Sequence, residues 1–478
     1  MSGFIGFFIK SSSTAKSWSL FSSIITLIIS LTGIVLYNDN AHLQFNAEWI
    51  PALNSRFAVR LDGMGQILCL LTAVSFPIIF IATWREEYKN AKNFYALMLL
   101  SQTGLMGVFL SMDALLFYFF WELALVPVYF LASQWGGERR IQATFKFFIY
   151  TFVGSLFMLV GIIFLYFHTK DHSFSIESFY ALRTTISSQD QSWLFWLFFV
   201  AFAIKMPIFP FHTWQPDTYE QSSTAVTMVL SGIMVKMGLF GLIRWLAPVL
   251  PIGTWAWGDT ASALCIIGMI YASLLAIRQN DLKRMVAYSS IAHIGLMCLA
   301  VFATTQISMQ GVMIQMFNHG INIIGLWIVV DLIERQFHTR KLNELGGLAL
   351  KAPSLAILLV VIALANVALP LTNAFIGEFM MFSGIYGSVA TKYNVVFTVT
   401  AGISIILSAV YMLNMIQKVF YGNSNALTAN AKDIRANEKI ILAVIVVLIL
   451  VVGIYPQPVF ELTKGIVDTI LAKMNYKQ

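Results

Sequence analysis

The segment AIKMPIFPFHTWQPD (residues 203–217) decides how this chain folds. It places Lys205 and two prolines, Pro207 and Pro210, in a run that is otherwise apolar from residue 193 to 213. Each proline removes a backbone donor and frees a carbonyl, which a bilayer tolerates only where protein or water satisfies the freed group. The segment therefore predicts a broken membrane helix with a buried ionisable group beside the break.

A second segment, ANVALPLTNAFIGEF (residues 365–379), repeats this arrangement with Pro370 and Glu378. Pro207 and Pro370 are 163 residues apart, and the spans that contain them are five places apart in the expected series. Because successive spans alternate in direction, an odd separation of five spans places the second copy upside down relative to the first. Paired proline-interrupted segments are typical of inverted-repeat transporters, whose ion sites lie near the middle of the membrane.

The composition is that of a polytopic membrane protein. Of 478 residues, 58% are hydrophobic and 11% are charged, and a spanning helix needs about 20 apolar residues. Strands of alternating polarity are absent from the pattern. We therefore expect an all-α fold of about 13–14 spans in two inverted bundles, and thirteen apolar segments meet the length: 18–37, 61–84, 94–112, 114–134, 144–167, 193–213, 224–249, 260–277, 284–304, 307–333, 354–389, 393–421 and 439–456.

The formal charge of +7 could suggest nucleic acid, but its distribution indicates membrane topology and no nucleic-acid partner. If the N-terminus is cytoplasmic, nineteen Lys and Arg residues fall on the cytoplasmic side and nine on the other. The positive-inside rule then predicts a multi-pass protein of the bacterial inner membrane, with its C-terminus on the outer side.

Four regions are expected along the chain: N-terminal helices, a first half-channel repeat, a second inverted repeat, and a C-terminal helix with an amphipathic tail, at 1–93, 94–249, 255–421 and 439–478. The longest polar segments between spans are 38–60, 168–192 and 334–353. Residues 457–478 carry apolar side chains at helical spacing and predict a short helix on the outer surface.

Six ionisable residues near the middle of apolar segments are the candidate site: Glu122, Lys205, Lys236, His293, His319 and Glu378. A charge at the bilayer centre costs about 2.5–3.5 kcal/mol on insertion scales, so such residues face the protein interior. Six of them along one chain predict a pathway for charge.

Glu122 and Lys205 form the first candidate pair. An opposite charge nearby favours protonated lysine, whereas burial disfavours it, so a changing distance to Glu122 would switch the proton affinity of Lys205. The competing interpretation is a structural ion pair.

Lys236 has no acidic residue in its own segment, which predicts a buried, hydrated lysine. In this reading every deep cation is lysine, which can release a proton as arginine effectively cannot.

His293 and His319 lie in consecutive spans and could relay protons, since histidine titrates near neutral pH. Ser289 and Gln315 each precede a histidine by one helical turn and are the expected hydrogen-bond partners. The alternatives are that the histidines are hydrogen-bonded packing residues or that they form a bis-histidine haem site.

Glu378 could hold the last proton before an exit, or it could bind backbone donors freed around Asn373.

Other chemistry has little support. Cys69, Cys265 and Cys298 have no CxxC spacing and are expected to be apolar fillers. The sequence contains no Walker A loop, dinucleotide fingerprint, zinc spacing or cysteine cluster for iron–sulfur. Energy for uphill transport must therefore come from a partner or from an ion gradient.

Six motifs together resemble the antiporter-like membrane subunits of respiratory complex I, over nearly the whole chain from about residue 20: FYFFWELALVPVYF (117–130), KFFIYTFVGSLFMLVG (146–161), IKMPIFPFHTWQPD (204–217), NDLKRMVAYSSIAHIG (280–295), HTRKLNELGGL (338–348) and FIGEFMMF (375–382). The resemblance implies fourteen spans in two inverted five-helix bundles. Relative to that pattern the first helix is missing or reduced to MSGFIGFFIK.

The resemblance also implies roles. Glu122 and Lys205 would form the coupled pair of the first half-channel, Lys236 the connection, His293 and His319 the central axis, and Glu378 the terminal group. Glutamate at that last position resembles the M-type subunit, whereas L-type subunits and related cation/proton antiporters usually have lysine there.

The expected function is proton translocation as a non-redox subunit of NADH:quinone oxidoreductase. The resemblance implies no prosthetic group on this subunit, with FMN, iron–sulfur clusters and quinone on partner subunits. Its expected partners are neighbouring antiporter-like subunits, the lipid bilayer, protons and water. A multi-component cation/proton antiporter is the alternative.

Overall fold

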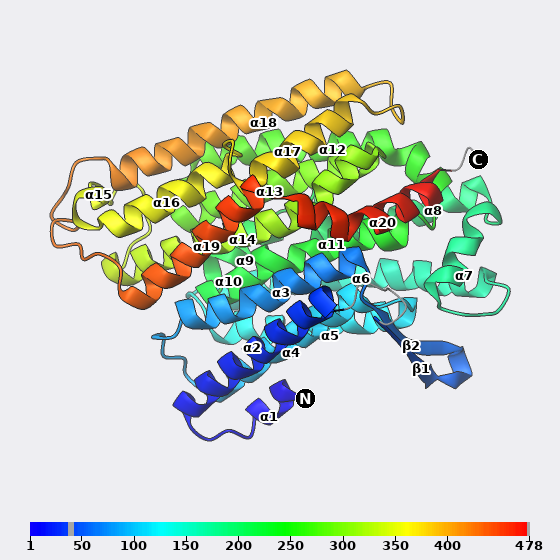
Figure 1. Ribbon diagram of the computed structural model, residues 1–478, viewed down its shortest axis with the longest axis horizontal. Helices are drawn as coiled ribbons and strands as arrows, with labels where there is room; N and C mark the ends of the chain where they lie inside the picture. The colour runs from blue at the N-terminus through cyan, green and yellow to red at the C-terminus, as the bar shows by residue number, and fades with distance from the viewer. Residues whose placement is uncertain (37–42, 476–478) are drawn as a thin grey trace.

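Long apolar helices make up most of the chain, as the composition predicts. The computed structural model describes residues 1–36 and 43–475; Lys477, counted above on the outer side, lies outside them. In the described ranges, eleven helices are long and apolar enough to cross a membrane: Ser12–Val35, Gly63–Ala82, Ala91–Leu110, Ala114–Gln134, Arg140–His168, Thr224–Leu246, Pro251–Arg278, Leu282–Phe302, Gln306–Phe337, Asn394–Phe420 and Ala436–Ile454. The protein is an all-α, multi-pass membrane protein (Figure 1).

Both proline-interrupted segments are broken, as predicted. Helix α8 (Ser188–Lys205) ends at Lys205, and the chain becomes helical again at α9 (Trp214–Gln221). The second segment is divided into α16 (Pro353–Asn366) and α17 (Asn373–Tyr386). These interruptions explain why expected spans 193–213 and 354–389 are not among the eleven continuous helices. The inverted relation between the two copies stays a prediction.

A third irregular segment was not predicted. The span expected at 224–249 consists of α10 (Thr224–Val229), the π-helical turn η4 (Leu230–Met234), α11 (Val235–Gly241) and a second π-helical turn, η5 (Leu242–Leu246). A Cβ added at Gly320 of α14 (Gln306–Phe337) would lie 2.9 Å from the carbonyl oxygen of Gly232. The absence of a side chain at Gly320 therefore allows η4 and α14 to pack closely.

The polar segment 38–60 contains a short β-hairpin, which was not predicted. Strands β1 (Gln44–Ile50) and β2 (Ser55–Arg60) pair antiparallel, with Gln44 opposite Arg60. A short 3₁₀ turn, Pro51–Leu53, joins them, and Asn54 has a positive φ of 48°. Asparagine tolerates that conformation in turns.

Several expected boundaries also move. The span expected at 260–277 is α12 (Pro251–Arg278), which begins nine residues earlier because Pro251 occupies the first helical turn, where proline loses no hydrogen bond. The other two long polar segments contain the short helices α7 (Ile176–Ala181) and α15 (Leu348–Lys351).

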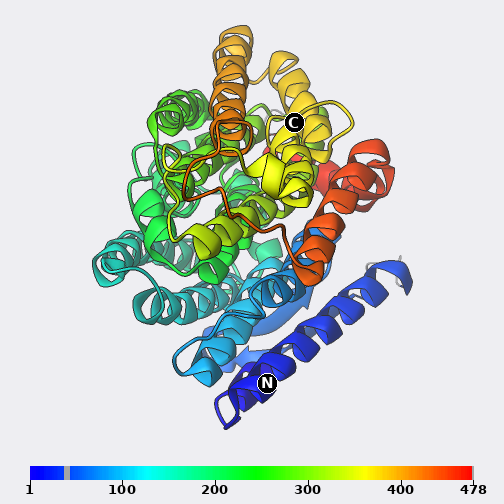
Figure 2. The ribbon, with the colours of Figure 1, turned by 90° about the vertical axis from the view of Figure 1, so that its left-hand side faces the viewer.

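Helix α14 lies at the centre of the bundle. It packs against α3 (Gly63–Ala82), α13 (Leu282–Phe302), α16 and α17, and its most apolar stretch is buried throughout. By contrast, α2 (Ser12–Leu36) is the least buried of the eleven helices and lies at one edge (Figure 2). The remaining helices are α1 (Ser2–Gly6), α4 (Ala91–Leu110), α5 (Ala114–Gln134), α6 (Arg140–His168), α18 (Asn394–Met415, extended by the turn η6, Ile416–Phe420) and α19 (Ala436–Ile454).

The predicted C-terminal helix is present as α20 (Gln457–Met474). Its buried residues Thr463, Val467, Ile470 and Met474 share one face, and the helix packs against α3 and α14. The amphipathic pattern therefore describes a helix whose apolar side faces its own protein.

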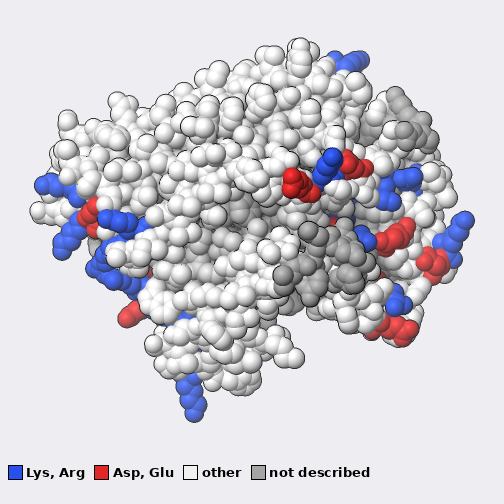
Figure 3. All heavy atoms as spheres, viewed as in Figure 1, with Lys and Arg blue, Asp and Glu red and all other residues white. Residues whose placement is uncertain are grey.

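Charged side chains are concentrated at the two ends of the molecule in the view of Figure 3. Between these ends the surface of this face is largely free of Lys, Arg, Asp and Glu, apart from a small group over α20. This distribution matches a membrane protein whose middle faces hydrocarbon. We refer to the end that carries α15 as the α15 end and to the opposite one as the α7 end (Figure 1).

Candidate functional site

Lys236 and His319 form the centre of the site. The Lys236 side chain is fully buried on α11, and its Nζ lies 2.8 Å from Nδ1 of His319 on α14. Nζ also donates a hydrogen bond of 2.9 Å to the carbonyl of Ser231 in the π-helical turn η4. The unpredicted turn thus supplies one of the two groups that hold the lysine in place.

His293 and Glu378 continue the row. Nδ1 of His293 on α13 lies 3.1 Å from Oε1 of Glu378 on α17, and both side chains are buried. The rings of His293 and His319 have centroids 5.7 Å apart. Four of the six predicted residues, from four different helices, therefore form one continuous buried row, Lys236–His319–His293–Glu378, which we call the central row.

The second helix break is surrounded by side-chain amides. Nδ2 of Asn318 donates to the carbonyl of Asn373 at 2.8 Å, and Nδ2 of Asn322 donates to the side chain of Asn373 at 3.0 Å. Asn373 in turn accepts from the backbone of Ala374. Asparagine side chains, rather than Glu378, therefore satisfy the backbone near Asn373, and the carboxyl group is left for His293.

The partners expected for the histidines were wrong. Ser289 bonds Asn366 at 3.2 Å, while Gln315 lies 3.5 Å from Glu378. Nε2 of His319 instead faces Ser290 Oγ at 3.4 Å. Spacing within one helix cannot reveal contacts made across helices, and here those contacts determine the partners.

Lys205 stands apart from the central row. Its side chain is 2% exposed at the end of α8, and its Nζ has no hydrogen-bond partner among the described residues. The ammonium lies 5.4 Å from the ring centroid of Trp121 and 5.8 Å from that of Phe147. Aromatic faces stabilise a cation through the ring quadrupole without fixing a proton acceptor.

Glu122 on α5 does not form a salt bridge with Lys205, which argues against the static ion pair. The two residues share no ion pair within 4.0 Å, and Oε1 of Glu122 is buried without a hydrogen-bond partner in the described chain. Glu122 is nevertheless close enough for its charge to act on Lys205. Lys205 is therefore buried and unpaired, Glu122 is half-buried with its Oε1 unpaired, and the two side chains interact without direct contact.

Arg244 corrects the expectation that every deep cation is lysine. It is 1% exposed in η5, and its guanidinium makes two hydrogen bonds of 2.6 and 2.7 Å with the carboxylate of Asp62. Its position near the end of an apolar segment suggested an interfacial residue. Asp62 caps the first turn of α3, so this pair connects α3 to η5.

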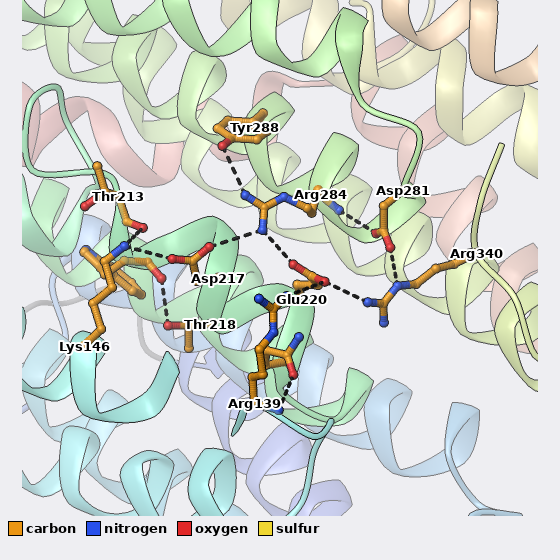
Figure 4. Close-up of polar contacts among 12 residues, drawn as sticks. Arg139, Lys146, Thr213, Asp217, Thr218, Glu220, Asp281, Arg284, Tyr288 and Arg340 are labelled. Atoms are coloured by element: carbon orange, nitrogen blue, oxygen red, sulfur yellow. Dashed lines mark hydrogen bonds and ion pairs between the residues drawn. The ribbon is translucent and has the colours of Figure 1, made fainter. Parts of the chain in front are cut away.

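A network of ion pairs near the α15 end was also missed (Figure 4). Asp217 and Glu220 on α9 both pair with Arg284 of α13, at 3.2 and 2.7 Å. Lys146 of α6 pairs with Asp217 at 2.8 Å, and Arg340 with Glu220 at 3.0 Å. The network holds α9 in place after the first break. The charged residues of QPDTYEQ (215–221) and NDLKR (280–284) are visible in the sequence, but the sequence does not show which of them pair.

The geometry disfavours the haem alternative. Both ring nitrogens of His319 face protein groups, Lys236 and Ser290, so this ring has no nitrogen free for an axial bond. The described residues contain no group of three or more His, Cys, Asp or Glu that could hold a metal ion. Cys69, Cys265 and Cys298 are free thiols buried in the apolar core.

The fold and the site together define a multi-pass membrane protein with interrupted helices around a buried ionisable row. The family described as NADH:quinone oxidoreductase/Mrp antiporter, TM, matches residues 111–453. The chain belongs to this family.

Its relatives cover nearly its whole length. NADH-quinone oxidoreductase subunit M of Rickettsia typhi is 35% identical over 459 residues, which is 95% of this chain and 92% of that protein. F(420)H(2) dehydrogenase subunit M of Methanosarcina mazei is 35% identical over 474 residues, 96% of this chain and 93% of that protein. A chain in the structure of respiratory complex I from Thermus thermophilus with bound NADH superposes with a TM-score of 0.91 at 25% identity, covering 99% of this chain and 97% of that one.

Proposed function

We propose that this chain is a proton-translocating membrane subunit of an NADH:quinone oxidoreductase, driven by redox chemistry in partner subunits. The subunit itself carries out no electron transfer. FMN, iron–sulfur clusters and quinone belong to the partners, and neighbouring antiporter-like subunits share the membrane with it. The proposed location is the bacterial inner membrane, with the α15 end in the cytoplasm and the C-terminus outside.

The central row is the observation that carries this proposal. Nζ of Lys236 lies 2.8 Å from Nδ1 of His319, and the ring of His319 lies 5.7 Å from that of His293 between centroids. Nδ1 of His293 lies 3.1 Å from Oε1 of Glu378. Each of these side-chain types can gain and release a proton. Buried ionisable groups at membrane depth are costly, and they mark ion paths and proton relays in membrane proteins. The row therefore supports lateral proton transfer from Lys236 to Glu378 at the second helix break.

Lys205 and Glu122 are proposed as the control element of the first half-channel. A buried lysine without a hydrogen-bond partner responds strongly to nearby charge, because little else stabilises its ammonium form. A conformational change that alters its distance from Glu122 would shift its proton between Lys205 and the central row. The prolines Pro207 and Pro210 make the backbone beside Lys205 irregular and are proposed as the point of movement.

Co-purification tests the proposal against the antiporter alternative. Affinity purification of this subunit from its native membrane should recover a large complex that oxidises NADH and reduces quinone. Recovery of hydrophobic subunits alone, with cation/proton exchange and no NADH oxidation, would establish the antiporter. Glu378 at the end of the row, where the antiporters usually have lysine, favours the first outcome.

Lys236→Arg tests the proton role directly. Arginine keeps the positive charge but effectively never releases its proton, so NADH-driven pumping in membrane vesicles should fall to a small fraction of wild type. NADH oxidation with an artificial acceptor should remain, because it reports only on assembled redox subunits. Undiminished pumping by this variant would mean that Lys236 acts as a fixed charge.

A further inference from the structure

A charged pocket opens at the α15 end, apart from the central row. It has a volume of about 700 Å³ and lies between the loop that precedes α4, the start of α10 and the end of α14. Two of its carboxyl groups, Glu86 from the loop and Asp331 from α14, lie next to one another. We call these two residues the carboxyl pair.

Other groups around the carboxyl pair balance only part of its charge. Arg335 lies 2.8 Å from the carboxylate of Asp331, and the Tyr88 hydroxyl donates to that of Glu86. Lys16 is bound to backbone carbonyls, including that of Glu86 at 2.7 Å, rather than to the carboxylate. Lys283, also in the pocket, pairs with Glu334 at 2.8 Å. Arg335 thus contacts the carboxyl pair directly, through Asp331, and the charge of Lys283 also acts on Asp331.

Neighbouring carboxylates resist simultaneous ionisation, so such a pair tends to retain one proton. Glu86 lies in the loop between α3 and α4, outside the spanning helices. Burial, followed by the charge of Asp331, raises the pKa of Glu86 to about 7, against the opposing effects of Tyr88 and Arg335. The carboxyl pair can therefore take up and release a proton near neutral pH.

Two antiparallel helical segments connect the carboxyl pair to the central row. One segment comprises residues 224–236 and the other residues 319–331. Each advances by twelve residues, which is about 18 Å along a helix axis. Thr224 lies beside Asp331 at one end, and Lys236 bonds His319 at the other. The segments pack against each other along α10, η4 and α14.

Polar atoms between these ends lack protein partners. Tyr219 and Trp327 are both fully buried, with ring centroids 6.0 Å apart, and neither Oη of Tyr219 nor Nε1 of Trp327 has a hydrogen-bond partner among the described residues. Ser223 Oγ is likewise buried and unpartnered in the described chain. Thr227 on α10 and Ser231 on η4 add hydroxyl groups, which donate to the backbone carbonyls of Ser223 and Thr227 and keep their oxygens free to accept. Buried polar groups without protein partners generally bind water.

From this arrangement we infer that Glu86 and Asp331 form a proton-loading site that supplies Lys236 and His319 through hydrated side chains between α10 and α14. The inference rests on the proposed function, because it names the entrance to the same pathway. A proton from bulk water binds one carboxylate; later the carboxyl O–H bond breaks, water carries the proton inward, and the neutral amine of Lys236 accepts it. No electrons are transferred.

The test uses the assembled complex in membrane vesicles. Glu86→Gln should reduce NADH-driven proton pumping several-fold at alkaline pH and much less at acidic pH, where bulk protons are abundant. Glu87→Gln is the matched control, since Glu87 is the next residue and is exposed; it should pump like wild type at every pH. Equal pumping by Glu86→Gln and Glu87→Gln across the pH range would overturn the inference.

Two further measurements separate this inference from the proposed function. Lys236→Ala should abolish pumping. If it does so while Glu86→Gln pumps normally, the loading site is rejected and the proposed pathway is retained. Normal pumping by Lys236→Ala would reject the pathway itself. Infrared difference spectra between wild type and Glu86→Gln should show a protonated carboxyl band that disappears as pH rises through neutrality. A spectrum without that band would also overturn the inference.

Discussion

The two helix breaks use the same backbone device but hold their ionisable groups in opposite ways. At the first break Lys205 is buried against Trp121 and Phe147 without a hydrogen-bond partner among the described residues. At the second, Glu378 is bonded to His293 and lies 3.5 Å from the amide of Gln315. An unpaired charge responds to distant charges, whereas a bonded one passes its proton to a neighbour. The comparison supports the proposal that the first break controls proton transfer and the second conducts it.

The largest effect is expected at the first break. Lys205→Ala or Glu122→Ala should abolish proton pumping while the complex remains assembled, because Lys205 has no hydrogen-bonded neighbour that could take over its role. The measurement is NADH-driven acidification of vesicles, with NADH oxidation by an artificial acceptor as the measure of assembly. Lys170→Ala, an exposed lysine in a loop, is the control. Wild-type pumping by Lys205→Ala would remove the distinction between the two breaks.

A smaller loss is expected at the second break. Glu378→Gln keeps a hydrogen-bonding side chain but cannot titrate, so pumping should fall strongly without being abolished if Gln315 and bound water allow slow transfer. His293→Gln should lie between Glu378→Gln and wild type. Glu461→Gln, an exposed acidic residue on α20, should pump normally. If Glu378→Gln is as inactive as Lys205→Ala, the second break contains an obligatory proton site as well.

The smallest effect on pumping is expected where a buried cation is fully paired. Asp62→Asn keeps the cap of α3 but leaves Arg244 as an uncompensated buried charge, which should cost about 3–5 kcal/mol of stability. Asp62→Asn combined with Arg244→Met should recover much of that loss, because no buried charge remains. Thermal unfolding of the complex measures the first effect, and vesicle pumping should change little. A pumping defect in the double variant would place Arg244 on the proton pathway.

The sequence predicts both breaks and all six members of the candidate site, because a charged residue or a proline in an apolar run is conspicuous without any neighbours. It could not predict which residues meet. Lys236, His319, His293 and Glu378 come from four helices, and the spacing inside one helix wrongly indicated Ser289 and Gln315 as partners of the histidines. Lys205 and Arg244 illustrate the same limit of sequence-based prediction. Both are buried cations, but only Arg244 has a carboxylate partner.

The sequence by itself determined that this chain crosses the membrane many times, that two of its helices are broken, and that ionisable groups lie within its apolar segments. Those properties depend on local composition, since hydrophobicity, proline and charge act residue by residue. Only the tertiary structure decided that Glu122 and Lys205 remain unpaired, that a π-helical turn holds Lys236, and that Glu86 meets Asp331. These depend on distances between helices far apart in the chain, and packing alone sets such distances.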